Sequence, residues 1–112
     1  IYTYNMTGKP GWFLFDGLVK QDVLTGTEEF YFFGEGVFGS ETPFAPRTGA
    51  TAEDDGYLLT FTTDMNRDCS ECLIFDATRL TDGPIARVRL PERISSGTHS
   101  CWTPAEALVS RQ

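Results

Sequence analysis

The sequence has 112 residues and a mass of 12.5 kDa, which limits it to one domain or part of one. Hydrophobic residues make up 40% of it and charged residues 22%, a composition typical of folded soluble proteins and unlike that of disordered or collagen-like chains. The net charge of −7 argues against a nucleic-acid partner. No apolar run approaches the roughly 18 residues of a transmembrane helix, and the first residues show no signal-peptide pattern.

The first predicted elements are the two strands of a hairpin. Residues 17–23 and 28–33 are rich in residues that favour strands, and the Gly-containing segment 24–27 between them is typical of a tight turn. A short strand follows at 42–47, and it contains two prolines. Because proline has no N–H to donate to a neighbouring strand, 42–47 is predicted to lie at the edge of a sheet.

Alternation with a period of two predicts the next strand, 57–64. Tyr57, Leu59 and Phe61 fall on one face, opposite a face that carries threonines, so the strand is expected to be half-buried. The apolar run at 72–77 predicts a more central strand. A further alternating strand is predicted at 85–90.

These four strands form an antiparallel meander that begins at an edge, which is the form of a propeller blade. The sequence is therefore predicted to be all-β, with one complete blade at 40–91 and the outer half of the preceding blade at 1–36. Residues 92–112 form a tail, in which 97–102 are expected to start the inner strand of the next blade. A helical turn is predicted only at 104–109.

The three cysteines leave three interpretations open, which are a zinc site, a redox dithiol and structural cysteines. Cys69 and Cys72 form a C-x-x-C pair, and with His99 and Cys101 they contain the ligand types of a zinc site. The spacing of the second pair is poor for such a site, and Cys72 opens an apolar run, so structural cysteines are the favoured interpretation. An odd number of cysteines favours a reducing compartment and a cytoplasmic location.

Several segments resemble the carotenoid cleavage oxygenase family, which includes apocarotenoid oxygenases, lignostilbene dioxygenases and the retinoid isomerase of the retinal pigment epithelium. The resemblance covers nearly the whole chain, in order and with compatible spacing. The segments are 15–20, 40–47, 53–61, 73–77, 86–91 and 97–99.

The resemblance implies the C-terminal part of a seven-bladed β-propeller enzyme, a non-haem iron dioxygenase that cleaves a conjugated C=C bond of a carotenoid or apocarotenoid into two carbonyl products. In such enzymes four histidines hold Fe(II), and His99 falls at the last of these positions. Glu41 falls where the family places a glutamate that accepts a hydrogen bond from a ligand histidine. The substrates implied are O₂ and a lipophilic conjugated molecule, in a tunnel near which Thr98 and Trp102 would lie.

The chain departs from the family pattern at Thr98, where many members have Phe before the histidine. A stilbene is therefore kept as an alternative substrate. His99 is the only histidine in the sequence, so the 112-residue chain alone is expected to be inactive. An alternative of another class is a non-catalytic β module for binding or structure, with zinc at its cysteines. The oligomeric state and a peripheral membrane contact are left open.

Overall fold

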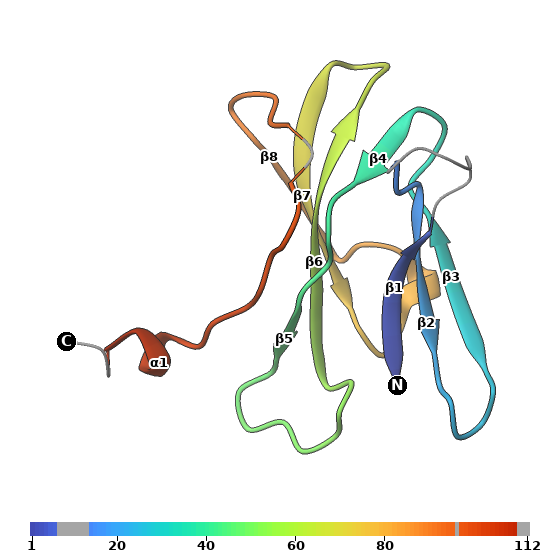
Figure 1. The fold of residues 1–112 in the computed structure, drawn as a ribbon, viewed down its shortest axis with the longest axis vertical. Helices are drawn as coiled ribbons and strands as arrows, with labels where there is room; N and C mark the ends of the chain where they lie inside the picture. The colour runs from blue at the N-terminus through green and yellow to red at the C-terminus, as the bar shows by residue number, and fades with distance from the viewer. Residues whose placement is uncertain (7–13, 96, 110–112) are drawn as a thin grey trace.

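The computed structural model describes residues 1–6, 14–95 and 97–109, which form two antiparallel β-sheets that pack side by side and a C-terminal tail (Figure 1). The first sheet has the strand order β1-β2-β3, with β1 at Tyr2–Met6, β2 at Gly17–Gln21 and β3 at Glu28–Phe32. The predicted hairpin is therefore confirmed. Strand β1 was not predicted, and it pairs with β2 from Tyr2 opposite Gln21 to Met6 opposite Gly17.

The second sheet contains the predicted meander. Its strands are β5 at Phe44–Pro46, β6 at Gly56–Asp64, β7 at Cys69–Asp76 and β8 at Ala86–Arg89, each antiparallel to the next. A further short strand, β4 at Val37–Gly39, pairs with the other end of β6. Both β4 and β5 pair only with β6 among the described strands, so the predicted edge position is confirmed, although the edge strand is divided in two and begins before residue 40.

The buried face of β6 is the one that carries the threonines. Leu58, Thr60 and Thr62 are almost fully buried toward the first sheet, whereas Phe61 on the other face is 44% exposed. Burial of the threonine hydroxyls is compatible with folding because that of Thr60 donates to the carbonyl of Ser40, at 3.2 Å. Both faces of β6 therefore carry side chains suited to burial, as in a sheet that is covered on both sides.

The core lies between the two sheets. Leu18 of β2 packs with residues of β6, of β7 and of the segment that follows β7. Tyr31 of β3 meets the ring of Phe75 edge-to-face, with 5.0 Å between the ring centroids. The core residues of these two strands and of the segment after β7 are Leu58, Leu73, Phe75, Ala77 and Leu80. That segment contains a 3₁₀ helix at Leu80–Asp82.

A buried lysine also joins the two sheets. The side chain of Lys20 on β2 is 8% exposed, and its Nζ lies 2.9 Å from Asp54 and 2.8 Å from the carbonyl oxygen of Ala77, which it meets as a hydrogen-bond donor. Glu29 lies 3.5 Å away on the neighbouring strand. These partners satisfy a cation that would otherwise be costly to bury.

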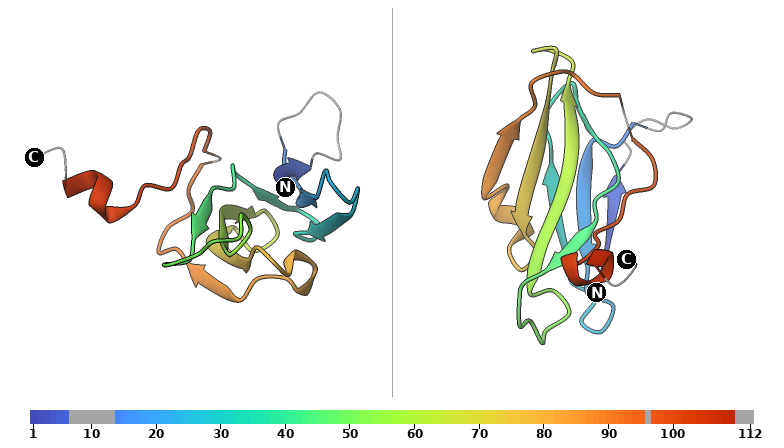
Figure 2. Two further views of the ribbon diagram at one scale, coloured as in Figure 1. Left: turned by 90° about the horizontal axis from the view of Figure 1, so that it is seen from below. Right: turned by 90° about the vertical axis from the view of Figure 1, so that its left-hand side faces the viewer.

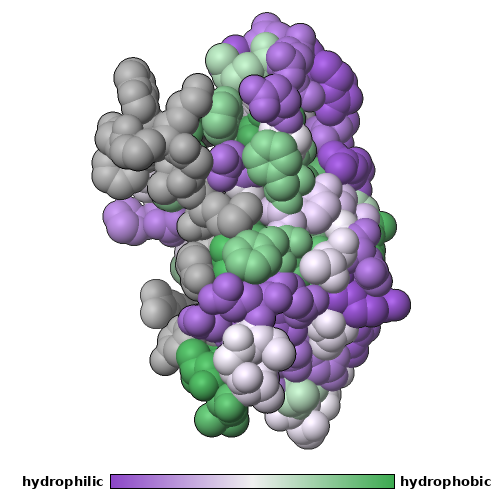
Figure 3. Space-filling view, turned by 90° about the vertical axis from the view of Figure 1, so that its right-hand side faces the viewer, coloured by the Kyte–Doolittle hydropathy of each residue, from purple (hydrophilic) through white to green (hydrophobic). Residues whose placement is uncertain are grey.

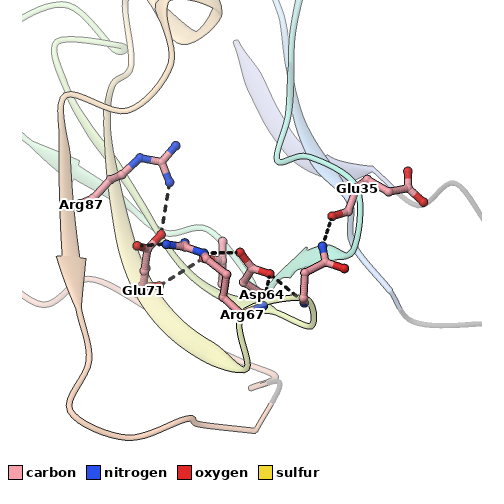
Figure 4. A network of polar contacts seen from close by, with 7 residues as sticks. Glu35, Asp64, Arg67, Glu71 and Arg87 are labelled. Atoms are coloured by element: carbon pink, nitrogen blue, oxygen red, sulfur yellow. Dashed lines mark hydrogen bonds and ion pairs between the residues drawn. The ribbon is translucent and has the colours of Figure 1, made fainter.

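A second polar network ties the β6–β7 hairpin to its surroundings (Figure 4). Arg67 in the turn donates to Asp64 at the end of β6 and to Glu71 on β7, and Arg87 on β8 also donates to Glu71. The Asn66 amide donates to the backbone carbonyl of Glu35, beside the first sheet. This end of the second sheet is therefore fixed by side chains as well as by strand pairing.

The outer parts of the chain differ from their predictions in two ways. All four residues of β8 are exposed, because β8 is an edge strand with one described neighbour, so the half-buried pattern predicted for 85–90 is wrong. Residues 97–102 form no strand; the tail runs away from the sheets to the predicted helical turn, α1 at Ala105–Val109 (Figures 1 and 2). Within the described part of the chain no helix is long and apolar enough to cross a membrane.

Parts of two predicted regions lie outside the described residues: 7–13 of the first partial blade, and 96 and 110–112 of the tail. The outer side of the first sheet, seen in Figure 3, is mixed, with hydrophobic side chains between hydrophilic ones. Phe30 and Phe32 of β3 are each more than half exposed.

Candidate metal-ligand site

The structure brings Glu41 and His99 together, although 57 residues of sequence separate them. The Nδ1 atom of His99 lies 3.6 Å from Oε1 of Glu41, which is an ion-pair distance and longer than a hydrogen bond. The other carboxylate oxygen, Oε2, accepts a hydrogen bond from the backbone N–H of Ser100 at 2.9 Å. The Ser100 hydroxyl approaches the backbone carbonyl of Glu41 at 3.4 Å.

Glu41 is held in this place by a bulge in the edge of the second sheet. Between the pairs Gly39–Thr62 and Phe44–Leu58, the edge has four residues, 40–43, where β6 has three, 59–61. An extra residue of this kind bends the strand and re-aims a side chain, which is why bulges are common next to functional sites. The bulge interrupts the edge strand at Glu41.

Ser40 anchors the bulge to β6. Its backbone N–H donates to the carbonyl of Phe61 at 2.9 Å, and its hydroxyl accepts from the N–H of Phe61 at 3.3 Å. Its carbonyl accepts from the Thr60 hydroxyl. Because Ser40 itself is buried, the backbone that carries Glu41 is fixed to the middle of the sheet.

The electrostatics of the site favour an ionised Glu41. The backbone N–H groups of Ser100 and His99, in that order, lower the pKa of the Glu41 carboxyl below its ordinary value. An ionised carboxylate is an acceptor only. One of its oxygens can therefore accept a hydrogen bond from a backbone N–H while the other faces the imidazole.

The His99 side chain is open to solvent, with 94% of its surface exposed. Its backbone has φ 62°, in the left-handed region that residues other than glycine seldom adopt. With Nδ1 facing Glu41, Nε2 is the ring nitrogen available to a metal ion. The geometry is compatible with one histidine of a metal site that has a carboxylate beside its other ring nitrogen.

No group of three or more histidine, cysteine, aspartate or glutamate side chains comes together as a metal site in residues 1–6, 14–95 and 97–109. With one histidine in the sequence, the chain can supply a single imidazole to a metal site, and Glu41 is the carboxylate beside that imidazole. An imidazole with a carboxylate beside it has the groups expected of one histidine ligand in an all-histidine iron site. The remaining ligands of such a site would have to come from residues that this sequence does not contain.

The zinc interpretation of the cysteines fails on geometry. Cys69 and Cys72 both lie within β7, three residues apart, so their side chains point to opposite faces of the sheet. Cys69 is buried, Cys72 is half-buried and Cys101 is exposed, and all three are free thiols. Burial raises the pKa of the Cys72 thiol, which favours the unreactive protonated form.

The two residues predicted to lie near a substrate tunnel have different surroundings. Trp102 lines an apolar hollow of about 270 Å³ with Ala45, Tyr57, Leu59 and Ile74, on the outward face of the second sheet. Thr98 is exposed and is not among the residues that line this hollow. The structure thus places Trp102 beside apolar side chains of the second sheet.

Sequence reasoning missed the roles of Ser40 and Ser100. No motif marks either residue as an anchor, because their contacts to Phe61 and Glu41 involve backbone groups and join residues distant in sequence. The one available signal is that Ser100 directly follows His99.

Comparison with known proteins identifies the family. The retinal pigment epithelial membrane protein family matches residues 1–104. The chain belongs to this family, the carotenoid cleavage oxygenases. Carotenoid 9,10(9',10')-cleavage dioxygenase 1 of Pisum sativum is 37% identical over 94 residues, which are 82% of this chain and 17% of the relative.

Two solved structures share the fold. The lignostilbene dioxygenase of Pseudomonas brassicacearum superposes with a TM-score of 0.80 at 32% identity, over 88% of this chain and 20% of that one. Cobalt-substituted apocarotenoid oxygenase (ACO) of Synechocystis superposes with a TM-score of 0.72 at 34% identity, over 78% of this chain and 18% of that one. The two sheets are therefore part of a carotenoid oxygenase propeller, as predicted.

The chain spans about a fifth of the length of the relatives it matches. The family includes non-haem iron dioxygenases, which cleave C=C bonds of conjugated lipophilic substrates with oxygen.

Proposed function

We propose that this chain is the C-terminal part of a non-haem Fe(II) dioxygenase, in which His99 is one of four histidine ligands and Glu41 orients its imidazole. The observation that carries the proposal is the contact between Glu41 and residues 99–100, which turns Nδ1 toward a carboxylate and leaves Nε2 for the metal. When bound, the iron would supply the activation of O₂ that cleavage of an alkene requires.

The residues of this chain have three tasks in the proposed enzyme. His99 binds through a neutral imidazole, Glu41 orients the ring and accepts the backbone N–H of Ser100, and the bulge at Ser40 fixes Glu41. An all-histidine ligand set is less anionic than two histidines and a carboxylate, and a neutral ligand needs an acceptor on its second nitrogen to keep one ring orientation.

The proposed substrate is a carotenoid or apocarotenoid, cleaved at one conjugated C=C bond so that each oxygen atom of O₂ ends in one carbonyl product. A stilbene is the second candidate, because the family relatives with the same fold include enzymes named for both substrate classes. A cytoplasmic location is part of the proposal, on the strength of the odd cysteine count. Peripheral membrane contact and oligomeric state are not part of it.

The test uses the full-length gene product, loaded anaerobically with Fe(II) and then exposed to O₂ with an apocarotenoid or a hydroxylated stilbene. The expected result is two aldehyde products from one of them, detected by chromatography and mass spectrometry, and none from His99→Ala. Iron-loaded wild type that cleaves neither class would overturn the proposed reaction. Cleavage by the purified 112-residue chain with added Fe(II) would contradict the prediction that the chain alone is inactive.

A further inference from the structure

Ser100 contacts Glu41 at two points. Its backbone N–H donates to the carboxylate oxygen Oε2 at 2.9 Å, and its hydroxyl lies 3.4 Å from the backbone carbonyl oxygen of Glu41. The first contact has ordinary hydrogen-bond length and the second is long. The backbone N–H and the hydroxyl of Ser100, in the tail, therefore contact two different oxygens of Glu41, at the edge of the second sheet.

These contacts flank an unusual backbone conformation. His99 has φ 62°, and a non-glycine residue in this region must be held there by its surroundings. The backbone N–H of Ser100, directly after this residue, donates to the Glu41 carboxylate.

Glu41, the partner of Ser100 in these contacts, is anchored to the second sheet. Glu41 follows Ser40, which is 6% exposed and is bonded to Phe61 through both its backbone N–H and its hydroxyl. Ser100 therefore contacts a residue whose backbone is anchored to the second sheet, whereas the tail around Ser100 is exposed and belongs to no strand.

We propose that Ser100 is a positioning residue for His99, which its hydroxyl helps to hold in the left-handed conformation that aims the imidazole. The proposal rests on the proposed function, in which His99 binds the metal. It adds that the ligand is oriented through its backbone as well as through the contact between Glu41 and its ring. Ser100 itself touches neither metal nor substrate.

The test compares Ser100→Ala with Ser100→Thr in the full-length protein. Ser100→Ala removes the hydroxyl, and the expected result is a dissociation constant for Co(II) that is weaker by about 3- to 10-fold, with altered visible absorption bands of bound Co(II). Ser100→Thr keeps a hydroxyl and is expected to bind within about twofold of wild type. Ser95→Ala, at an exposed serine near the start of the tail, is the matched control and should bind as wild type does.

Thermal unfolding is measured alongside, because a purely structural role would lower the unfolding temperature without altering the Co(II) spectrum. Wild-type affinity and spectrum in Ser100→Ala would overturn the inference. So would an equal loss in Ser100→Thr. Failure of the proposed function is recognised separately, since His99→Ala would then keep its Co(II) affinity.

Discussion

The backbone N–H of Ser100 donates a 2.9 Å hydrogen bond to the carboxylate of Glu41, 59 residues earlier in the chain. This bond joins a bulge in the edge of the second sheet to a tail that forms no strand of its own. It places the imidazole of His99 beside the other oxygen of the same carboxylate. One glutamate thus meets the ring of the proposed metal ligand and the backbone of the residue that follows it.

Substitutions of Glu41 are predicted to weaken metal binding in a graded way. Glu41→Gln keeps an oxygen that can accept from the backbone but places an amide where the imidazole meets a carboxylate, and about 10-fold weaker binding of Fe(II) or Co(II) is expected. Glu41→Ala removes both acceptors and should bind more weakly still. The measurement is competition with a chelator of known affinity.

Glu92→Gln is the matched control for this series, because it makes the same chemical change at an exposed position. It is expected to bind metal with wild-type affinity. If Glu41→Ala bound as tightly as Glu92→Gln, Glu41 would have no part in orienting the ligand.

Lys20 is predicted to stabilise the packing of the two sheets. Lys20→Met removes the donor to the Ala77 carbonyl and the partner of Asp54. A loss of about 1–3 kcal/mol in the free energy of unfolding is expected, since the remaining groups are left partly buried without their partner. Urea unfolding measures this loss, with Arg89→Met on the exposed strand β8 as control, for which the change should be within about 0.5 kcal/mol. Equal stability of the two variants would refute this role.

Asp76 is predicted to contribute to the fall in stability at acid pH. Hydrogen bonds from the Thr78 hydroxyl and backbone N–H, and then Arg79, lower the pKa of Asp76 to about 2. Because the folded-state pKa lies below the unfolded value, this contribution is complete above about pH 4 and is lost as the pH falls toward 2.

Asp76→Asn cannot ionise, so it should show a smaller loss of stability between pH 4 and pH 2.5 than wild type. Urea midpoints at several pH values provide the measurement. Asp82→Asn, at an exposed position nearby, is expected to keep the wild-type pH dependence. An unchanged pH dependence in Asp76→Asn would show that its carboxylate does not contribute.

The strands could be predicted from sequence because alternation and turn residues act locally. The meander of β5 to β8 and the hairpin of β2 and β3 follow from such signals. The buried face of β6 could not be predicted, since the aromatic side is the more apolar one. It depends on hydroxyl contacts such as that of Thr60 with Ser40, and these exist only once the bulge has formed.

The candidate site was predictable in part. The resemblance indicated Glu41 and His99, and the structure shows that they are in contact. The bulge depends on a register shift of one residue between the pairs at Gly39 and Phe44, which no local pattern encodes. The link through Ser100 depends mainly on a backbone N–H, which every residue except proline possesses, so its side chain gave no signal.

The most direct test of the central claim is the iron content of the full-length protein, purified without oxygen, in wild type and in His99→Ala. About one iron per wild-type molecule and a large loss in His99→Ala, with an unchanged unfolding temperature, is the predicted result. Since the His99 side chain is exposed and makes no core contact, the fold should tolerate its removal. A His99→Ala protein that still holds one iron per molecule would contradict the assignment of His99 as a ligand.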